Sequence, residues 1–188
     1  MTNTRSVRPG FVALLVIVTV AFLTGCTGGP APTATSSAAP APANSLGMTC
    51  SELVTPPVVA ALHPGLKAQS TFKPMPATYP GQIKALGGLS CGWQATDGLT
   101  LAVAVVKLSP AALAAKESKV IASSTATLAF GDSAEVRGYV ANTGGTSSGD
   151  VEVFTTSGYW VSAVSPLFVS ASDAEAVIAG VLQAVPSG

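Results

Sequence analysis

Charge is the scarcest property of this sequence. Only 10% of its 188 residues are Asp, Glu, Lys or Arg, and it has three Cys and a single His, His63. The nine basic residues equal the nine acidic ones, so the sequence does not predict a basic surface that binds nucleic acid. With one His and no cluster of Cys and His, the common zinc-binding patterns are missing. We expect no metal and no cofactor.

No apolar stretch is long enough to cross a bilayer as a helix. The longest run, Phe11 to Leu23, has 13 residues, whereas a membrane-spanning helix needs about 18 to 20. Arg5 and Arg8 precede the run. This pattern predicts a signal peptide over residues 1–25. An uncleaved helical anchor is the alternative.

A short motif ends the apolar run. Leu23-Thr24-Gly25-Cys26 resembles the lipobox of bacterial lipoproteins, in which the signal peptide is cleaved before the Cys and the Cys carries the lipid. The resemblance implies a mature chain that starts at an acylated Cys26 on the extracytoplasmic face of the cell membrane. Because Arg5 and Arg8 are then removed, 9 − 2 = 7 basic residues face 9 acidic ones, a net charge of −2.

The stretch after Cys26 has neither charge nor large apolar residues. Residues 27–45 are Pro, Ala, Ser, Thr, Gly and Asn only, and such a segment cannot bury enough surface to fold. Residues 26–45 are therefore predicted to be a lipidated Cys and a disordered tether, which reaches at most about 60 Å. Residues 46–188 remain for a single domain.

Two Cys remain once Cys26 carries a lipid. Cys50 and Cys91 have one possible pairing in an exported domain, so a disulfide is expected. Two free, buried thiols are the alternative.

The domain alternates amphipathic helices with hairpins. Helices are predicted at about 56–63, 110–122 and 172–185, and strands at 89–95, 99–108, 127–130, 134–141, 151–156 and 159–165. The strand at 99–108 is almost wholly apolar, which predicts a central strand covered on both faces. The pattern indicates an α+β fold in two layers, with a largely antiparallel sheet packed by about three helices and closed by one disulfide.

Two loops are candidates for binding. Residues 66–87 are rich in Pro and Gly, and loops of this length in compact domains are commonly functional. This segment supplies the candidate binding surface of Phe72, Lys73, Tyr79 and Lys84. The second candidate loop is 142–150.

Two patterns suggest a catalytic or a calcium-binding site, but the sequence around them does not fit either. Gly88-Leu89-Ser90-Cys91-Gly92 matches G-x-S-x-G, the motif of α/β-hydrolases, but it runs into a strand and a hairpin rather than a helix. The acidic pairs Asp132/Glu135 and Asp150/Glu152 suggest calcium, yet the sequence has no EF-hand loop. We therefore expect these carboxylates to be solvated at loops and strand edges.

Four short motifs of the mature chain, taken together, resemble those of actinobacterial cell-envelope lipoproteins of unknown function. The motifs are Cys50-Ser51-Glu52-Leu53, Cys91-Gly92-Trp93, Gly131-Asp132-Ser133-Ala134, and the helix from Ser172 to Val185. The resemblance implies the disulfide and an α+β fold, and it implies no catalytic residues.

The sequence therefore favours a non-enzymatic role. We expect a membrane-anchored lipoprotein that binds an envelope protein or a small molecule. A carrier of a lipid or another apolar small molecule, with a cavity between sheet and helices, is the alternative. A serine hydrolase that uses Ser90 is the more distant one.

Overall fold

The structure, a computed structural model, describes residues 45–127, 129–130, 135–141 and 149–186. All of them belong to one unit, residues 39–188. The predicted signal peptide, Cys26 and the predicted tether up to residue 44 lie outside the described residues, as does most of the 142–150 loop.

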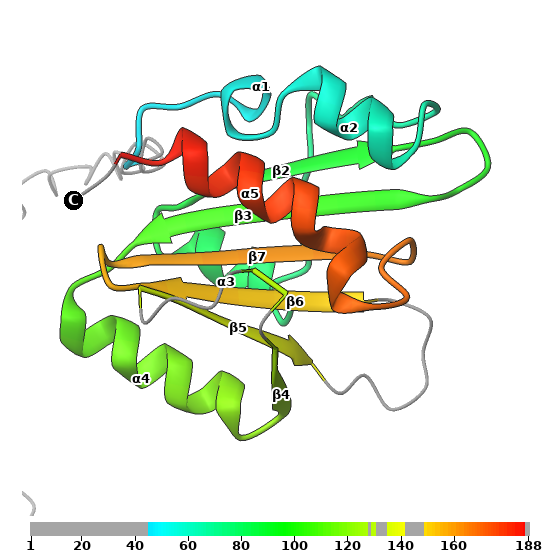
Figure 1. Cartoon of the computed structure of the whole chain (residues 1–188). Helices are drawn as coiled ribbons and strands as arrows, with labels where there is room; N and C mark the ends of the chain where they lie inside the picture. Colours follow the sequence, from blue (N-terminus) through cyan, green and yellow to red (C-terminus); the bar gives the residue numbers. More distant parts are fainter. Residues whose placement is uncertain (1–44, 128, 131–134, 142–148, 187–188) are drawn as a thin grey trace, which may run out of the picture. The chain divides into compact units, whose positions relative to one another are not determined.

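Within this part of the chain, seven strands form one sheet in the order β1-β2-β3-β7-β6-β5-β4 (Figure 1). Every neighbouring pair is antiparallel. The strands are β1 (Lys67–Ala68), β2 (Leu89–Gln94), β3 (Thr100–Lys107), β4 (Ser124–Thr127), β5 (Val136–Ala141), β6 (Gly149–Thr155) and β7 (Tyr159–Ser165). The apolar strand β3 pairs with β2 and β7, as its composition predicted.

Two tight turns set the strand pairing on either side of the sheet centre. The turn between β2 and β3 contains Gly98 at φ +89°, and the Asp97 carboxylate accepts a hydrogen bond from Leu99 N at 3.1 Å. The turn between β6 and β7 contains Gly158 at φ +97°. Glycine adopts such values readily, so both predicted hairpins are confirmed.

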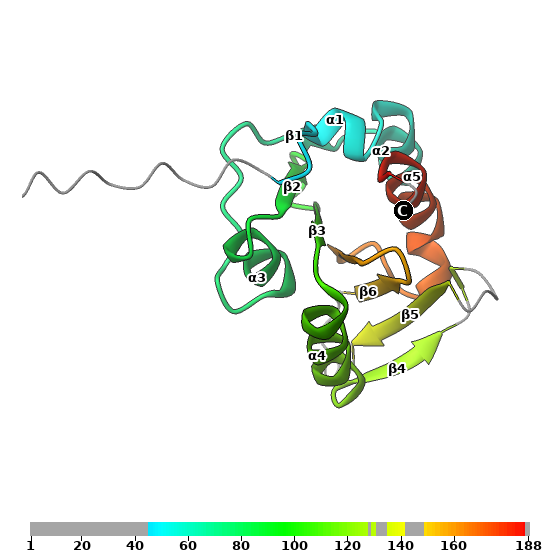
Figure 2. The same ribbon diagram turned by 90° about the vertical axis from the view of Figure 1, so that its left-hand side faces the viewer.

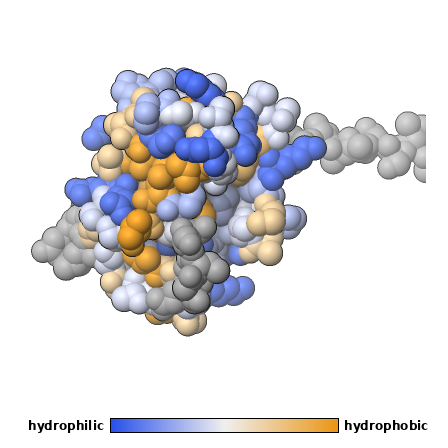
Figure 3. Space-filling model, turned by 90° about the vertical axis from the view of Figure 1, so that its right-hand side faces the viewer, coloured by the Kyte–Doolittle hydropathy of each residue, from blue (hydrophilic) through white to orange (hydrophobic). Residues whose placement is uncertain are grey.

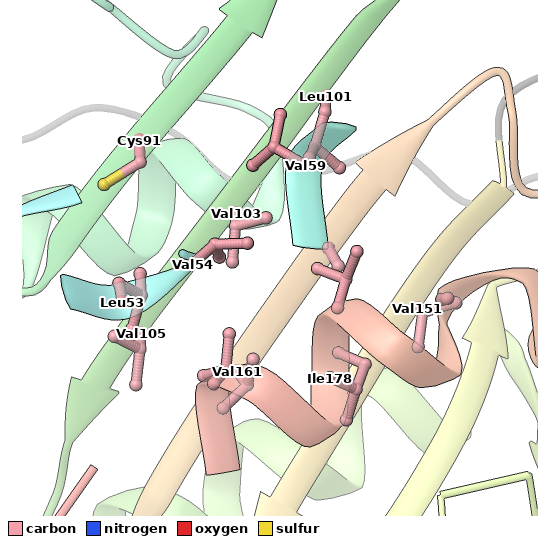
Figure 4. Packing of buried hydrophobic residues seen from close by; sticks show 14 of the residues in the cluster. Leu53, Val54, Val59, Cys91, Leu101, Val103, Val105, Val151, Val161 and Ile178 are labelled. Carbon is pink, nitrogen blue, oxygen red and sulfur yellow. The ribbon is translucent and has the colours of Figure 1, made fainter. Parts of the chain in front are cut away.

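One face of the sheet packs against helices α1 (Cys50–Leu53), α2 (Pro56–Leu62) and α5 (Glu175–Ala184). A short 3-10 helix, η1 (Ala171–Ala174), leads into α5. Figure 4 shows Val103 and Val105 of β3 lying beneath Leu53 and Val54. These four side chains are at most 1% exposed. This larger core is mostly aliphatic, and Trp93, Tyr159 and Phe168 are its buried aromatic residues.

The other face packs against α3 (Tyr79–Ala85) and α4 (Pro110–Ile121) (Figure 2). Its core combines aliphatic residues with a group of three aromatic rings. The Trp160 and Phe154 rings stack with centroids 5.9 Å apart, and Tyr139 meets Phe154 edge-on. Successive residues of a strand point to opposite faces, so β3 gives Val103 to the first core and Ala104 to the second.

The predicted α+β class and antiparallel sheet are confirmed. The sheet is covered on both faces, by five α-helices in the described residues, whereas the sequence predicted two layers and about three helices. The prediction that residues 66–87 are a loop was wrong at α3. The Thr78 side chain caps this helix by accepting from Gly81 N at 3.3 Å, and Pro80 occupies its first turn.

The predicted Cys50–Cys91 disulfide is confirmed. It joins the first residue of α1 to β2 across 41 residues, and it fixes the helical layer to the sheet. In the chain-entropy description, a loop of this length stabilises the fold by roughly 3 to 4 kcal/mol.

Candidate functional site

A hollow of about 380 Å³ opens between α4 and the β6–β7 turn. We call it the α4-side hollow. Its apolar lining residues include Leu108, Pro110, Leu113 and Ala114. Its polar lining residues include Lys107, Glu117, Arg137, Thr156 and Ser157. Such a mixture of apolar side chains with a few polar groups is typical of small-molecule sites.

Two of the polar lining residues, Glu117 and Arg137, belong to a hydrogen-bond network between α4 and β5. Arg137 donates to Glu117 through Nε at 2.5 Å and through Nη2 at 2.8 Å, and the Tyr139 hydroxyl donates to Glu117 Oε1 at 2.8 Å. The hydrogen bonds from Arg137 lower the pKa of Glu117, while burial raises the pKa of Tyr139. Glu117 is thus a charged carboxylate at neutral pH, and the guanidinium is oriented by a two-pronged contact.

A second hollow, of about 450 Å³, lies on the other side of the same turn. This α5-side hollow is lined by Glu135 and Val136 before and in β5, by the end of α5 with Leu182 and Val185, and by the turn itself. Residues Thr155, Thr156 and Ser157 border both hollows. The β6–β7 turn is therefore a hydroxyl-bearing ridge between two depressions.

The described chain begins at this same end of the sheet (Figure 1). Ser45 N donates to Gly87 O at 3.0 Å, and a Cβ on the adjacent Gly88 would touch Val106. The residue after Val106, Lys107, pairs with Tyr159 at the start of β7. The first described residue, Ser45, therefore lies at the end of the sheet that carries both hollows.

A third hollow is largely apolar. This disulfide-side hollow has a volume of about 300 Å³ and lies between β1, β2 and the first two helices, beside Cys50. Val54, Val59, Leu66 and Trp93 line it. Its volume is at the lower limit of known ligand pockets.

Hydrophobic residues also gather on the face at the opposite end of the sheet, which carries the β2–β3 turn (Figure 3). The connection between β7 and α5 lies at this end, and its Val169 is 92% exposed.

The predicted binding surface is not one continuous group of free side chains. Phe72 covers β2, because a Cβ on Gly92 would lie 2.2 Å from its ring. Tyr79 packs edge-on against Trp160. Lys73 and Lys84 are exposed. The two aromatic residues thus contribute to packing, and a binding role for the four residues stays a prediction.

The structure does not bring Ser90 and His63 together. Ser90 is buried beneath α3 and donates to Pro80 O at 2.7 Å. His63 follows α2 on the other face of the sheet, where its Nε2 lies 3.6 Å from Asp97. A Ser–His pair for nucleophilic catalysis requires direct contact of the two side chains.

The expectation of a solvated carboxylate was wrong for Glu152, whereas Asp150 is partly exposed. Glu152 is 0% exposed, and burial followed by the charge of Asp150 raises its pKa well above the ordinary value. Burial also raises the pKa of Asp150. Valines at 151 and 153 alternate with these acids, a period-two pattern that places both acids on one face of the strand. Asp132 lies outside the described residues.

The part of the chain that the structure describes contains no helix of sufficient length and hydrophobicity to span a membrane. It also contains no group of three or more His, Cys, Asp or Glu residues arranged to hold a metal ion.

The fold and hollows define a disulfide-linked α+β domain with a seven-stranded antiparallel sheet. Comparisons with family models, with curated proteins and with solved structures find no match for this chain.

Proposed function

We propose that this protein is a lipoprotein of the cell envelope, tethered by Cys26 to the extracytoplasmic face of the membrane, and that its domain binds a partner without catalysis. The observation that carries the proposal is the Cys50–Cys91 disulfide. Disulfides persist in oxidising compartments outside the cytoplasm. The disulfide also uses both Cys of the domain and leaves Cys26, in its lipobox-like motif, as the third.

The binding site in this proposal is the β6–β7 turn with the two hollows beside it. Its wall offers charged donors, a carboxylate and hydroxyl groups next to apolar side chains. The Arg137 guanidinium has five N–H donors, and two of them bond to Glu117. The ligand is a polar molecule or a chain segment with its own donors and acceptors.

Substitution of one small residue tests this site. Ala114 is exposed on α4 and lines the α4-side hollow, whereas its exposed neighbour Ala115 does not. We expect Ala114→Phe in the full-length protein to abolish at least one cross-linked product formed in intact cells. Ala115→Phe, the matched control, retains that product, because it adds the same bulk outside the hollow. Identical products from both variants and the wild type contradict the site.

The disulfide-side hollow supports a second function, the carriage of an apolar molecule. Its volume of about 300 Å³ and its aliphatic and Trp lining suit a short alkyl segment. Ala60 lines this hollow and is exposed, and Ala61 is exposed without lining it.

We expect a photoactivatable fatty acid supplied to cells to label the wild type and Ala61→Phe, with labelling of Ala60→Phe reduced severalfold. The Phe ring would occupy the space of the ligand. Equal labelling of all three proteins, or of none, removes the carrier function.

A further inference from the structure

A row of side chains that are polar except for Ala104 crosses the sheet beneath α3 and α4. The strand register places Ser90, Ala104, Ser162, Glu152 and Tyr139 side by side on β2, β3, β7, β6 and β5. The outer members have partners: Ser90 donates to Pro80 O, and Tyr139 donates to Glu117. The central members, Glu152 and Ser162, are both 0% exposed.

Glu152 lies beside a second carboxyl group. Asp150 stands two residues earlier on the same face of β6, and its charge is close enough to raise the pKa of Glu152. Trp160 Nε1 donates to Glu152 Oε2. Within the described residues, Asp150 Oδ1, Glu152 Oε1 and Ser162 Oγ have no well-aligned hydrogen bond, although Ser162 lies close to Glu152.

A fully buried carboxylate beside a second, partly buried carboxylate would be strongly unfavourable without a donor between them. Burial penalises each negative charge, and like charges at short distance repel. A proton between the two groups removes one charge and creates the missing hydrogen bond. A calcium ion needs six to eight oxygen ligands, whereas the cluster offers two carboxyl groups and one hydroxyl.

We propose that Asp150 and Glu152 share one proton in the folded domain, and that loss of this proton weakens the packing of α3 and α4 on the sheet.

Trp160 connects the acid pair to both helices. Its N–H group bonds to Glu152, its ring meets Tyr79 of α3 edge-on at 5.9 Å, and the Lys116 ammonium of α4 lies 5.4 Å from the ring centre. A second charge beside Trp160 changes the position favoured by this ring. Because the ring contacts both helices, the displacement reaches them through direct contacts.

Other titratable groups face the pair from the surrounding elements. Tyr139 of β5 is opposite Glu152 in register, and its hydroxyl donates to Glu117, which Arg137 neutralises. Lys116 of α4 and Tyr79 of α3 reach the pair only through Trp160. The cations Arg137 and Lys116 contact Glu117 and the Trp160 ring, respectively. A proton remains as the partner of the acid pair.

The sign of the pH effect follows from the raised pKa of Glu152. The folded state binds a proton that the unfolded state releases above about pH 4.5, the ordinary value for Glu. The folded state is therefore favoured at low pH and loses stability as the pH rises toward the folded-state pKa. Loss of one proton changes the unfolding equilibrium constant by up to about tenfold per pH unit.

The consequence for the α4-side hollow rests on the proposed binding function, because α4 forms one wall of that hollow. The shared proton is tested without any ligand. A failed test of the binding site therefore does not contradict the shared proton, and a failed test of the shared proton does not contradict the binding site.

The experiment measures the unfolding equilibrium constant of the full-length protein in detergent between pH 5 and 8. We expect the wild-type constant to rise with pH, by up to about tenfold per unit, and Glu152→Gln to abolish the slope, because the amide is a neutral equivalent of the protonated acid. Glu175→Gln, an exposed acid on the opposite helical layer, keeps the wild-type slope.

A second measurement needs no substitution of the acids. In a Trp93→Phe protein, Trp160 is the remaining Trp, and its fluorescence should titrate with a midpoint above the ordinary Glu value. Amide hydrogen exchange in α4 should accelerate over the same pH interval. A flat wild-type slope and a flat Trp160 signal overturn the proposal. Stabilisation of the wild type, but not of Glu152→Gln, by added calcium also overturns it, because a cation would then replace the proton.

Discussion

At the scale of single residues, Glu117 links α4 to β5. It accepts three hydrogen bonds, two from Arg137 and one from Tyr139, while its side chain is 12% exposed. Arg137 keeps more contact with water, at 37% exposed, and solvent weakens its part of the interaction. The carboxylate is the centre of the network, because its removal leaves both donors without their acceptor.

We expect Glu117→Ala to destabilise the domain by roughly 1 to 2 kcal/mol, since charged hydrogen bonds are lost and Arg137 is left partly buried. Because Arg137 lowers the pKa of Glu117, this stabilisation is present above the ordinary Glu value and disappears as the pH falls through the lowered pKa. Urea unfolding at pH 7 and pH 3 measures both effects. Exposed Glu135→Ala is the control, and equal stability of the two variants at pH 7 contradicts the assignment.

The acid pair shows what the sequence reveals about single residues. The alternation of Asp150, Val151, Glu152 and Val153 places acids on one face and valines on the other. An antiparallel sheet commonly leaves one face to water, and the sequence predicted solvated acids at loops and strand edges. Helices α3 and α4 cover that face, so Glu152 is buried rather than solvated. The strand pattern alone does not reveal this cover, because it arises from tertiary packing.

At the scale of elements, the short helices α1 and α3 are those that sequence patterns missed, and α3 shows why. Pro76, Pro80 and Gly81 suggested a loop, yet proline in a first helical turn is a start signal. Gly81 serves a close approach, since a Cβ there would lie 2.0 Å from Met75 O. Thr78 is a recognisable capping residue, but no periodic run of apolar residues comes after it. Only Pro80, Gly81 and Ile83 of this short helix are buried.

Thr78→Ala should cost about 1 kcal/mol, because the hydroxyl satisfies Gly81 N at the start of α3 and also donates to Met75 O at 2.7 Å. Thr55 offers a matched control: it precedes α2 in the same way but makes no side-chain capping bond. Denaturant unfolding of Thr78→Ala and Thr55→Ala measures the difference. A larger loss for Thr55→Ala would show that the Thr78 cap does not stabilise α3.

The longer elements were predictable because pattern and packing agree. The apolar run of β3 predicted cover on both faces, and its residues enter both cores. The helix α4 begins at Pro110 with Ser109 as its cap, which accepts from Ala112 N. Strand β4 lies at Ser124–Thr127, a few residues before its predicted position, and this edge strand has no buried residues to mark it.

At the scale of the whole molecule, the start of the described chain and the proposed binding site lie at one end of the sheet. Ser45 bonds to Gly87 there, and the α4-side and α5-side hollows flank the nearby β6–β7 turn. The hollows themselves were beyond sequence reasoning, because they combine α4, α5, β5 and a turn that are distant along the chain. The disulfide was predictable, since two Cys remain after Cys26 is assigned to the lipid.

The most direct test of the central claim is fractionation of cells that produce the full-length protein or its Cys26→Ser variant. We predict that the wild type sediments with membranes and yields a mature N-terminus at an acylated Cys26, because two or more acyl chains give stable anchoring. The variant should lack the acyl mass and the cleavage before residue 26. An unmodified Cys26 in membrane-bound wild-type protein would contradict the account.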